Sequence, residues 1–258
     1  MSTARRCPSG SRLRLELERW YAQSPGKELR EQELACLERL LADLFGYYLV
    51  QVGTAGGVRE IIELSRVRNH IVVPESLAQS LLGSQIVAYP NQLPIASDSI
   101  DVVFLPHSLD FAPDPRQVLR EAERVLIPEG RLIVFGFNAW GLWGSWWLLR
   151  FKSTRIPWCG NFLSQFRVMD WLSLLGFDVE LQFPLMFRPP LKRQALLARL
   201  GFMESLGGRY RLPLGGAYAL RAVKRVSTLT PLRPRWNDRA RVLPSGAVEP
   251  TTRSGGHA

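Results

Sequence analysis

The sequence predicts an α/β protein built on a mostly parallel sheet of about seven strands, with helices on both faces. Short, near-continuous apolar runs alternate with helical segments from Tyr47 onward, as strands do when helices bury both faces of a parallel sheet. A glycine-rich turn follows the first of these runs. The length of 258 residues allows one domain of about 200 residues with extensions at its ends.

Residues 1–46 predict a helical extension that precedes the sheet. Leu34, Leu37, Leu41 and Leu44 recur at helical spacing among charged residues, which indicates one or two amphipathic helices within 11–46. The triplet Ser24-Pro25-Gly26 is typical of a break between two helices.

Residues 47–225 carry the alternation of strands and helices. The expected strands are 47–52, 70–73, 85–89, 100–105, 130–137, 178–183 and 216–225, and the expected helices are 58–67, 75–82, 116–126 and 169–176. The last of these helices ends at Gly176, a residue that commonly stops helices. Between strand 130–137 and this helix lies an aromatic insertion at 138–165.

The net charge of +10 is concentrated in the C-terminal part of the chain. Residues 188–258 hold 14 Lys and Arg against 3 Asp and Glu, which leaves 1–187 nearly neutral. Residues 226–258 are basic, contain prolines and lack apolar periodicity, which predicts a disordered tail. Such a tail could contact the phosphates of nucleic acid or anionic lipid, but no RNA-binding module accompanies it.

The cysteines and the apolar segments indicate a cytoplasmic protein. Cys7, Cys36 and Cys159 share no metal-ligand spacing and predict neither a metal site nor a disulfide framework. The N-terminus has no apolar stretch of the kind that a secretory signal needs. Residues 132–149 are 18 uncharged residues, at the lower limit for a membrane span, but the run reads as a buried strand that Asn138 and glycines then interrupt.

The loop after the first strand is the first candidate ligand site. In an open parallel sheet, ligands bind beyond the carboxyl ends of the strands, near the point where strand order reverses. The loop Gly53-Thr54-Ala55-Gly56-Gly57 lies at such an end, and small residues let the backbone approach a ligand. A tight strand-to-helix turn without a ligand is the alternative.

The stretch from Leu93 to Phe137 is more specific. Leu93-Pro94 precedes a polar turn, Asp114-Pro115 starts a helix, and Pro128-Glu129-Gly130 leads into a strand. In this order the segment resembles the central block of class I S-adenosylmethionine-dependent methyltransferases of the type 11 subgroup. It is most similar to small-molecule enzymes such as the C-methylating enzymes of quinone biosynthesis, and to an uncharacterised proteobacterial group. The resemblance implies a Rossmann-like fold over roughly 47–223.

The resemblance also implies which residues would hold S-adenosylmethionine. They are Gln51, Gly53, Thr54, Ala55, Gly57, Glu75, Tyr89, Asn91, Leu93 and Leu105. Three acids that the family usually has are replaced or displaced: Gln51 stands for the acid of the first strand, and Asn91 for the acid that contacts adenine. The ribose-binding acid falls on Pro74, or on Glu75 if the alignment slips by one residue. Neutral hydrogen bonds are weaker than charged ones, so the pattern fits either a weak cofactor site or a retired one.

His107 is the candidate catalytic residue. It follows strand 100–105, whereas His70 precedes the second strand and His257 lies in the tail. The pKa of histidine suits a general base, although a buried capping histidine is the alternative. Asp110 reads as a turn or cap residue.

The aromatic insertion is the candidate lid over the acceptor. Trp140, Trp143 and Trp147 fall near one helical face, which suggests an apolar acceptor. A membrane-surface contact and plain core packing are the alternatives.

We therefore expect a methyltransferase that acts on an apolar or amphipathic small molecule. The alternatives are a catalytically inactive binding protein of the same fold, peripheral to a membrane, and an RNA methyltransferase. The sequence does not predict the acceptor or the oligomeric state.

Overall fold

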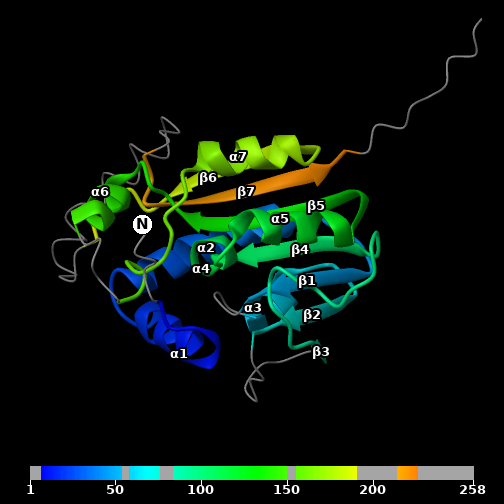
Figure 1. The fold of residues 1–258 in the computed structure, drawn as a ribbon, viewed down its shortest axis with the longest axis horizontal. Helices are drawn as coiled ribbons and strands as arrows, with labels where there is room; N and C mark the ends of the chain where they lie inside the picture. Colours follow the sequence, from blue (N-terminus) through cyan, green and yellow to red (C-terminus); the bar gives the residue numbers. More distant parts are fainter. Residues whose placement is uncertain (1–6, 54–57, 76–83, 150–154, 191–213, 226–258) are drawn as a thin grey trace, which may run out of the picture. The chain divides into compact units, whose positions relative to one another are not determined.

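The computed structural model describes residues 7–53, 58–75, 84–149, 155–190 and 214–225. The helices are α1 (Gly10–Tyr21), α2 (Gly26–Leu41), α3 (Val58–Leu64), α4 (Ser108–Phe111), α5 (Pro115–Val125), α6 (Leu142–Leu149) and α7 (Gln165–Leu174). The strands are β1 (Tyr48–Val52), β2 (Asn69–Val73), β3 (Ser84–Gln85), β4 (Ile100–Pro106), β5 (Leu126–Phe137), β6 (Phe177–Leu185) and β7 (Ala217–Lys224). Figure 1 shows these elements.

The described strands form one seven-stranded sheet in the order β3-β2-β1-β4-β5-β7-β6. The first five strands are parallel to their neighbours, while β7 is antiparallel to both β5 and β6. The predicted mostly parallel α/β sheet is therefore confirmed. Strand order reverses between β1 and β4, so their carboxyl ends define the expected ligand position.

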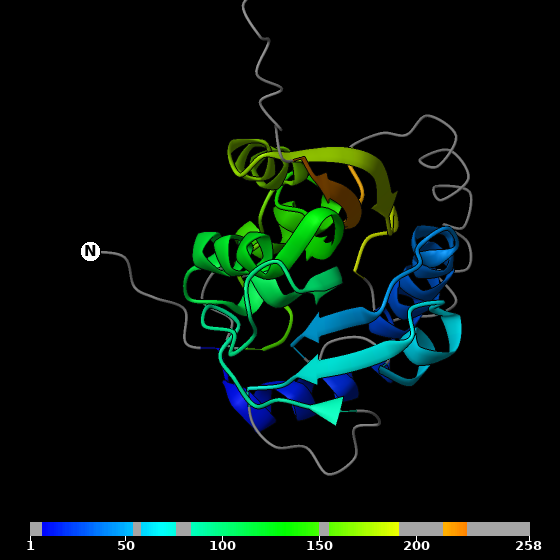
Figure 2. The same ribbon diagram turned by 90° about the vertical axis from the view of Figure 1, so that its right-hand side faces the viewer.

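Helices bury both faces of the sheet (Figures 1 and 2). Val103 and Leu105 of β4 belong to one core cluster with α5 and α7, whereas Val102 and Phe104 belong to another with α2. Alternate residues of a strand point to opposite faces, and both faces of β4 are apolar. This explains why the parallel strands read as continuous apolar runs.

Local signals in the sequence set the ends of α5 and α7. The side chain of Asp114 accepts hydrogen bonds from the backbone N–H groups of Arg116 and Gln117 at the start of α5, where it satisfies donors that have no helical partner. Ser164 caps α7 in the same way. Helix α7 stops just before Gly176, which has a φ of 81°, a conformation that favours glycine.

The two predicted N-terminal helices pack onto the domain. The expected break at 24–26 separates α1 from α2. Leu29, Leu37 and Leu40 of α2 pack against the sheet. Helix α1 lies by the ends of the strands (Figure 1), where Leu17 and Tyr21 form a small cluster with Ile156 and Cys159.

Two details of the sequence prediction need correction, and two others fall outside the described residues. Strand β3 spans only Ser84–Gln85 instead of 85–89, and Tyr89 instead forms an isolated bridge to Gln92. His70 lies within β2 and does not precede it. The expected helix 75–82 falls almost entirely outside the described residues, as does the tail at 226–258.

The prediction that the cysteines form no disulfide is wrong. Cys7 and Cys159 are bonded at a sequence separation of 152, and only Cys36 is free. Spacing in the sequence does not reveal this pair because the fold brings the start of the chain to the loop after α6.

Candidate active site

The carboxyl ends of β1 and β4 form the centre of the site. Gly53 follows β1 with a φ of 87°, and its N–H donates to the carbonyl of Val73 on β2. The hydroxyl of Ser108, which begins α4, donates to the carbonyl of Val52 at 2.5 Å. A Cβ on Gly53 would lie 3.0 Å from this hydroxyl. Both the backbone conformation and the close approach therefore require glycine at this position.

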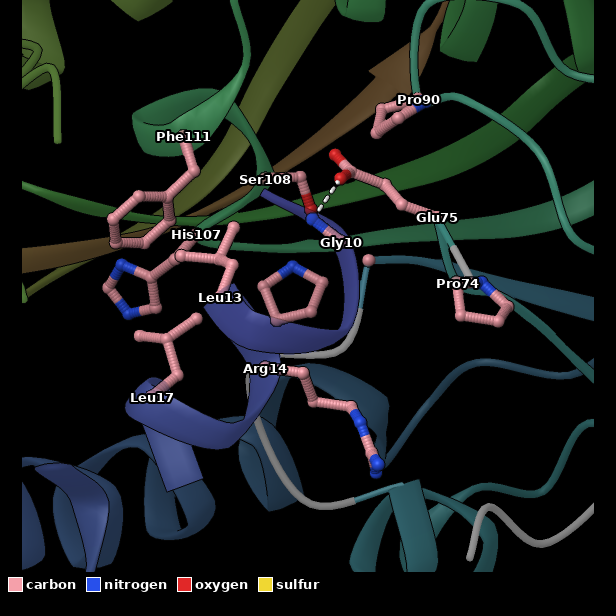
Figure 3. Close-up of a pocket in the computed structure, with 12 residues that line it drawn as sticks. Gly10, Leu13, Arg14, Leu17, Pro74, Glu75, Pro90, His107, Ser108 and Phe111 are labelled. Carbon is pink, nitrogen blue, oxygen red and sulfur yellow. Dashed lines mark hydrogen bonds between the residues drawn. The ribbon is translucent and has the colours of Figure 1, made fainter. Parts of the chain in front are cut away.

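Two adjoining cavities lie over these strand ends. The small cavity has a volume of about 40 Å³, and the large cavity has a volume of about 840 Å³. The small cavity is lined by Gly10, Leu13, Arg14, Leu17, Gly53, Pro74, Glu75, Pro90, Pro106, His107, Ser108 and Phe111 (Figure 3). The large cavity shares Leu13, Glu75, Pro90 and Phe111 with it and extends to Tyr89, Asn91 and Asp110. Only the large cavity falls in the range of about 300–1,000 Å³ that is usual for small-molecule sites.

Glu75 is the acid at the end of β2 and lines both cavities. Its Oε2 accepts a hydrogen bond of 2.9 Å from the N–H of Gly10 (Figure 3). Pro74 lines only the small cavity, and its side chain has no hydrogen-bonding group. Of the two positions that the sequence left open, Glu75 is therefore the one that carries a carboxylate.

Gln51 lies beside the loop and is buried. Its Nε2 donates to the carbonyl of Gly53 at 3.3 Å, while its Oε1 has no partner within the described part of the chain. Tyr89 is exposed. An unpaired buried acceptor beside the loop, a carboxylate at Glu75 and an amide at Asn91 fit the polar groups of the expected cofactor.

The remaining predicted cofactor residues divide into two groups. Thr54, Ala55 and Gly57 lie outside the described residues. Leu93 and Leu105 belong to the core cluster on the α5 side and do not line the two cavities. The N–H of Leu93 donates to Glu121 at 3.0 Å, so Leu93 positions the loop rather than a ligand.

His107 is the centre of a buried ionic cluster. It adopts a left-handed conformation with a φ of 54° and is almost fully buried. Its Nε2 lies 2.7 Å from Oε1 of Glu33 on α2, and its Nδ1 lies 2.8 Å from Oδ2 of Asp110 on α4. The hydroxyl of Tyr21 donates to the other oxygen of Glu33 at 3.1 Å.

The two carboxylates keep His107 protonated. Burial alone would lower the pKa of the imidazole, but the charge of Glu33 and the hydrogen bonds to Asp110 and Glu33 outweigh burial and raise the pKa to about 9. A protonated imidazole that donates from both nitrogens has no lone pair to accept a proton. This geometry argues against the expected role of His107 as a general base and for a role in holding α2 against α4.

Asp110 is more than the turn residue that the sequence indicated. It is fully buried, and its Oδ2 also accepts the N–H of Phe137 at 3.0 Å. Its Oδ1 has no partner among the residues that the structure describes, and the residue lines the large cavity. Burial raises the pKa of Asp110 to about 6, although the hydrogen bond and charge of His107 act in the opposite direction.

Sequence reasoning missed Glu33. It lies 74 residues from His107, so no local motif links the two. One signal was present: Glu33 falls on the same helical stripe as Leu29, Leu37 and Leu40, and a carboxylate on an apolar stripe needs a partner.

The three predicted lid tryptophans occupy three different environments. Trp143 is fully buried and donates from Nε1 to the carbonyl of Arg188 at 2.8 Å. Trp147 donates to the carbonyl of Gly160 and stacks on Phe162. Trp140 is 71% exposed. Trp143 is therefore a core residue, and the expectation that it lines a lid is not supported by its burial.

The comparison with known families finds a match over part of the chain. Residues 55–134 match the family described as methyltransferase domain. This segment holds α3, β2, β3, β4, α4 and α5. The matched segment is therefore similar to a methyltransferase domain, and it belongs to a sheet of the class I methyltransferase fold.

Two uncharacterized proteins are similar to this chain in sequence. YafS of Escherichia coli K12 is 34% identical over 155 residues, which are 60% of this chain and 62% of YafS. MJ1123 of Methanocaldococcus jannaschii is 28% identical over 92 residues, which are 36% of this chain and 45% of that protein. The chain thus spans less than two thirds of the length of these curated relatives.

Solved structures share the fold at low identity. An S-adenosylmethionine-dependent methyltransferase of Thermotoga maritima has a TM-score of 0.58 and 19% identity, covering 83% of this chain and 97% of that chain. Geranyl diphosphate methyltransferase in complex with S-adenosylmethionine has a TM-score of 0.53 and 18% identity, covering 86% and 94%. The [4+2]-cyclase SpnF has a TM-score of 0.52 and 16% identity, covering 76% and 80%. At these identities the likeness shows the fold alone.

Proposed function

We propose that this protein transfers a methyl group from S-adenosylmethionine to an apolar or amphipathic small molecule. One observation carries the proposal: the carboxyl ends of β1, β2 and β4 meet at the small cavity, which shares Glu75 with the large cavity beside it. This is the position at which open α/β sheets bind their ligands.

Different residues of the site would bind different parts of the cofactor. Glu75 would accept from the ribose hydroxyls, Asn91 would face the adenine, and Gln51 and Gly53 would hold the amino-acid end, as the family resemblance implies. S-adenosylmethionine supplies, when bound, a methyl group on a positively charged sulfur. The protein then has to align an acceptor with that methyl group, which is mainly a matter of positioning.

The large cavity supports an amphipathic acceptor. Leu13, Phe111, Pro113 and Val118 give it apolar walls, whereas Asp110 presents a carboxylate whose Oδ1 has no partner among the described residues. If the acceptor must lose a proton, His107 cannot receive it while both of its nitrogens are engaged.

Calorimetric titration with S-adenosylmethionine and S-adenosylhomocysteine tests the proposal. The parent protein is expected to show saturable binding. Glu75→Gln should weaken binding by about 10-fold, since a charged hydrogen bond becomes a neutral one. Glu31→Gln, an exposed acid on α2, is the matched control and should bind like the parent. Gly57→Asp should abolish binding. Absence of binding to the parent at millimolar ligand would favour an inactive binding protein of the same fold.

A second candidate function is attachment to a membrane surface. Leu142 and Leu148 of α6 are exposed, and the exposed ring of Trp140 contacts Phe166, beside the exposed cation Arg167. Exposed apolar side chains next to a cation suit an anionic lipid surface. No helix of the described residues is long and apolar enough to cross a membrane.

Sedimentation with vesicles that contain anionic lipid tests this contact. Replacing Leu142 and Leu148 by Ser should reduce binding to the vesicles. Leu174→Ser is the control, because Leu174 is 78% exposed at the end of α7. Equal sedimentation of both variants would remove the membrane contact.

The cytoplasmic location and the RNA methyltransferase alternative stay predictions. The disulfide between Cys7 and Cys159 weighs against a permanently reducing compartment. An RNA substrate would require salt-dependent binding that disappears when 227–258 are deleted.

A further inference from the structure

The first described residues form a strap across the candidate cofactor site. We define the strap as residues 7–21, which comprise Cys7, a short extended segment and α1. Its start is bonded covalently to Cys159. Its far end is held by the cluster in which Leu17 and Tyr21 pack on Ile156.

The strap occupies groups that a cofactor would need. Gly10, at the start of α1, donates its N–H to Glu75 at 2.9 Å (Figure 3). Leu13 and Leu17 of α1 line the same small cavity as Gly53, and Figure 3 shows both leucines beside His107. Only about 40 Å³ remains in this cavity, enough for a water molecule and too little for the amino-acid end of a nucleoside cofactor.

We propose that the Cys7–Cys159 disulfide is a redox latch that holds the strap over Gly53 and Glu75, and that its reduction exposes the site. The proposal rests on the proposed cofactor-binding function. With the bond intact, the start of the strap cannot leave the loop at 159, and Gly10 stays close to Glu75. With the bond broken, the start of the strap keeps the hydrogen bond from Gly10 to Glu75 and the packing of α1, while Tyr21 at its far end stays bonded to Glu33.

The chemical step is a thiol–disulfide exchange with a dithiol reductant. The dithiol gives two electrons and two protons, the S–S bond breaks, and Cys7 and Cys159 become thiols while the reductant becomes a disulfide. Cys7 is only partly buried and lines the large cavity, whereas Cys159 is buried. Cys7 is therefore the sulfur that a reductant reaches first.

The effect on affinity follows from the fraction of molecules with an open strap. Apparent affinity falls in proportion to the population that can bind. If the latch keeps the strap open in about one molecule in ten or fewer, reduction strengthens binding by about 10-fold or more.

The test compares three proteins by calorimetric titration with S-adenosylhomocysteine. They are the parent, Cys7→Ser, and Cys36→Ala, which removes the free cysteine and keeps the latch. Each is titrated after oxidation and after treatment with dithiothreitol, and alkylation with mass spectrometry counts the free thiols. We expect the parent and Cys36→Ala to bind at least 10-fold more tightly when reduced. Cys7→Ser should bind tightly in both conditions.

Hydrogen exchange gives a readout that does not depend on the ligand. Reduction of the parent should speed exchange of the amides of residues 10–17, and Cys7→Ser should show the fast exchange without reductant. Exchange of α7 should stay the same, because α7 lines neither cavity and packs in the core cluster on one face of the sheet.

Three outcomes would overturn the latch, and they differ from one another. Free Cys7 and Cys159 in the oxidised parent would show that the latch does not form. Equal affinity in the oxidised and reduced parent would overturn the latch and leave the cofactor function standing. Absence of binding in all proteins and conditions would overturn the latch together with the proposed function.

Discussion

Glu33 is the charged side chain on the buried face of α2, where its neighbours along the stripe are Leu29, Leu37 and Leu40. At the scale of single residues, this carboxylate and Asp110 decide the state of His107. A buried cation with two anionic partners is stable only while both partners are present, because each unpaired charge would cost several kcal/mol to bury.

We predict that Glu33→Ala lowers the free energy of unfolding by about 3–5 kcal/mol, since it leaves the buried His107 with one partner fewer. Glu31→Ala, an exposed acid of the same helix, should change it by less than about 0.5 kcal/mol. Urea denaturation measures both. Equal effects of the two variants would contradict the buried cluster.

Stability should also depend on pH through His107. Its folded pKa is raised from 6.5 to about 9, so its contribution is fully present below pH 6.5 and is lost as the pH rises through 9. The loss should amount to roughly 3 kcal/mol at most. Melting curves between pH 6 and 10 measure it. His107→Asn should be less stable at neutral pH but should melt at a nearly constant temperature across this range, and a slope like the parent's would assign the effect to another group.

At the scale of the elements, the apolar periodicity of the sequence predicted where helices and strands lie, but it did not predict what each face contacts. The runs 100–105 and 116–126 became β4 and α5 almost as expected, since each buries an apolar face that the sequence shows directly. Aromatic residues gave less information. Trp140 and Trp143 are three residues apart, yet one is 71% exposed and the other is fully buried, because Trp140 lies in the turn before α6 and only Trp143 belongs to the helix.

The two tryptophans therefore make a matched pair. Trp143→Ala should lower the free energy of unfolding by about 3–5 kcal/mol, because it leaves a cavity in the core and removes the hydrogen bond to Arg188. Trp140→Ala should change it by less than about 0.5 kcal/mol. Chemical denaturation separates the two. A small effect for Trp143→Ala would contradict its role in the core and favour the predicted role in a lid.

At the scale of the whole molecule, the sequence predicted the class of the sheet but not the contacts that connect distant segments. The glycine loop, Glu75 and Asn91 were predicted because they follow expected strand ends, and the structure brings Glu75 and Asn91 to one cavity. Glu33 and His107 are 74 residues apart, and Cys7 and Cys159 are 152 apart. Such pairs depend on where α1 and α2 pack, which apolar periodicity does not specify.

The C-terminal part of the chain allows a prediction about the stability of the whole molecule. Residues 1–226 form one compact unit by their contacts, separate from 227–258. Deleting 227–258 should leave the melting temperature almost unchanged. Deleting 214–258 should prevent folding, because it removes β7, the neighbour of both β5 and β6. Circular dichroism during heating measures both, and a stable fold without β7 would contradict the strand order.

The place of β7 also has a consequence for how the chain is made. β5 and β6 leave the ribosome first, and the strand that must join them is the last of the described strands to be synthesised. Until residues 217–224 emerge, β5 and β6 each expose an unpaired edge, and such edges promote association between nascent chains. The growing chain thus has a period in which a chaperone that covers strand edges would increase the yield of native protein.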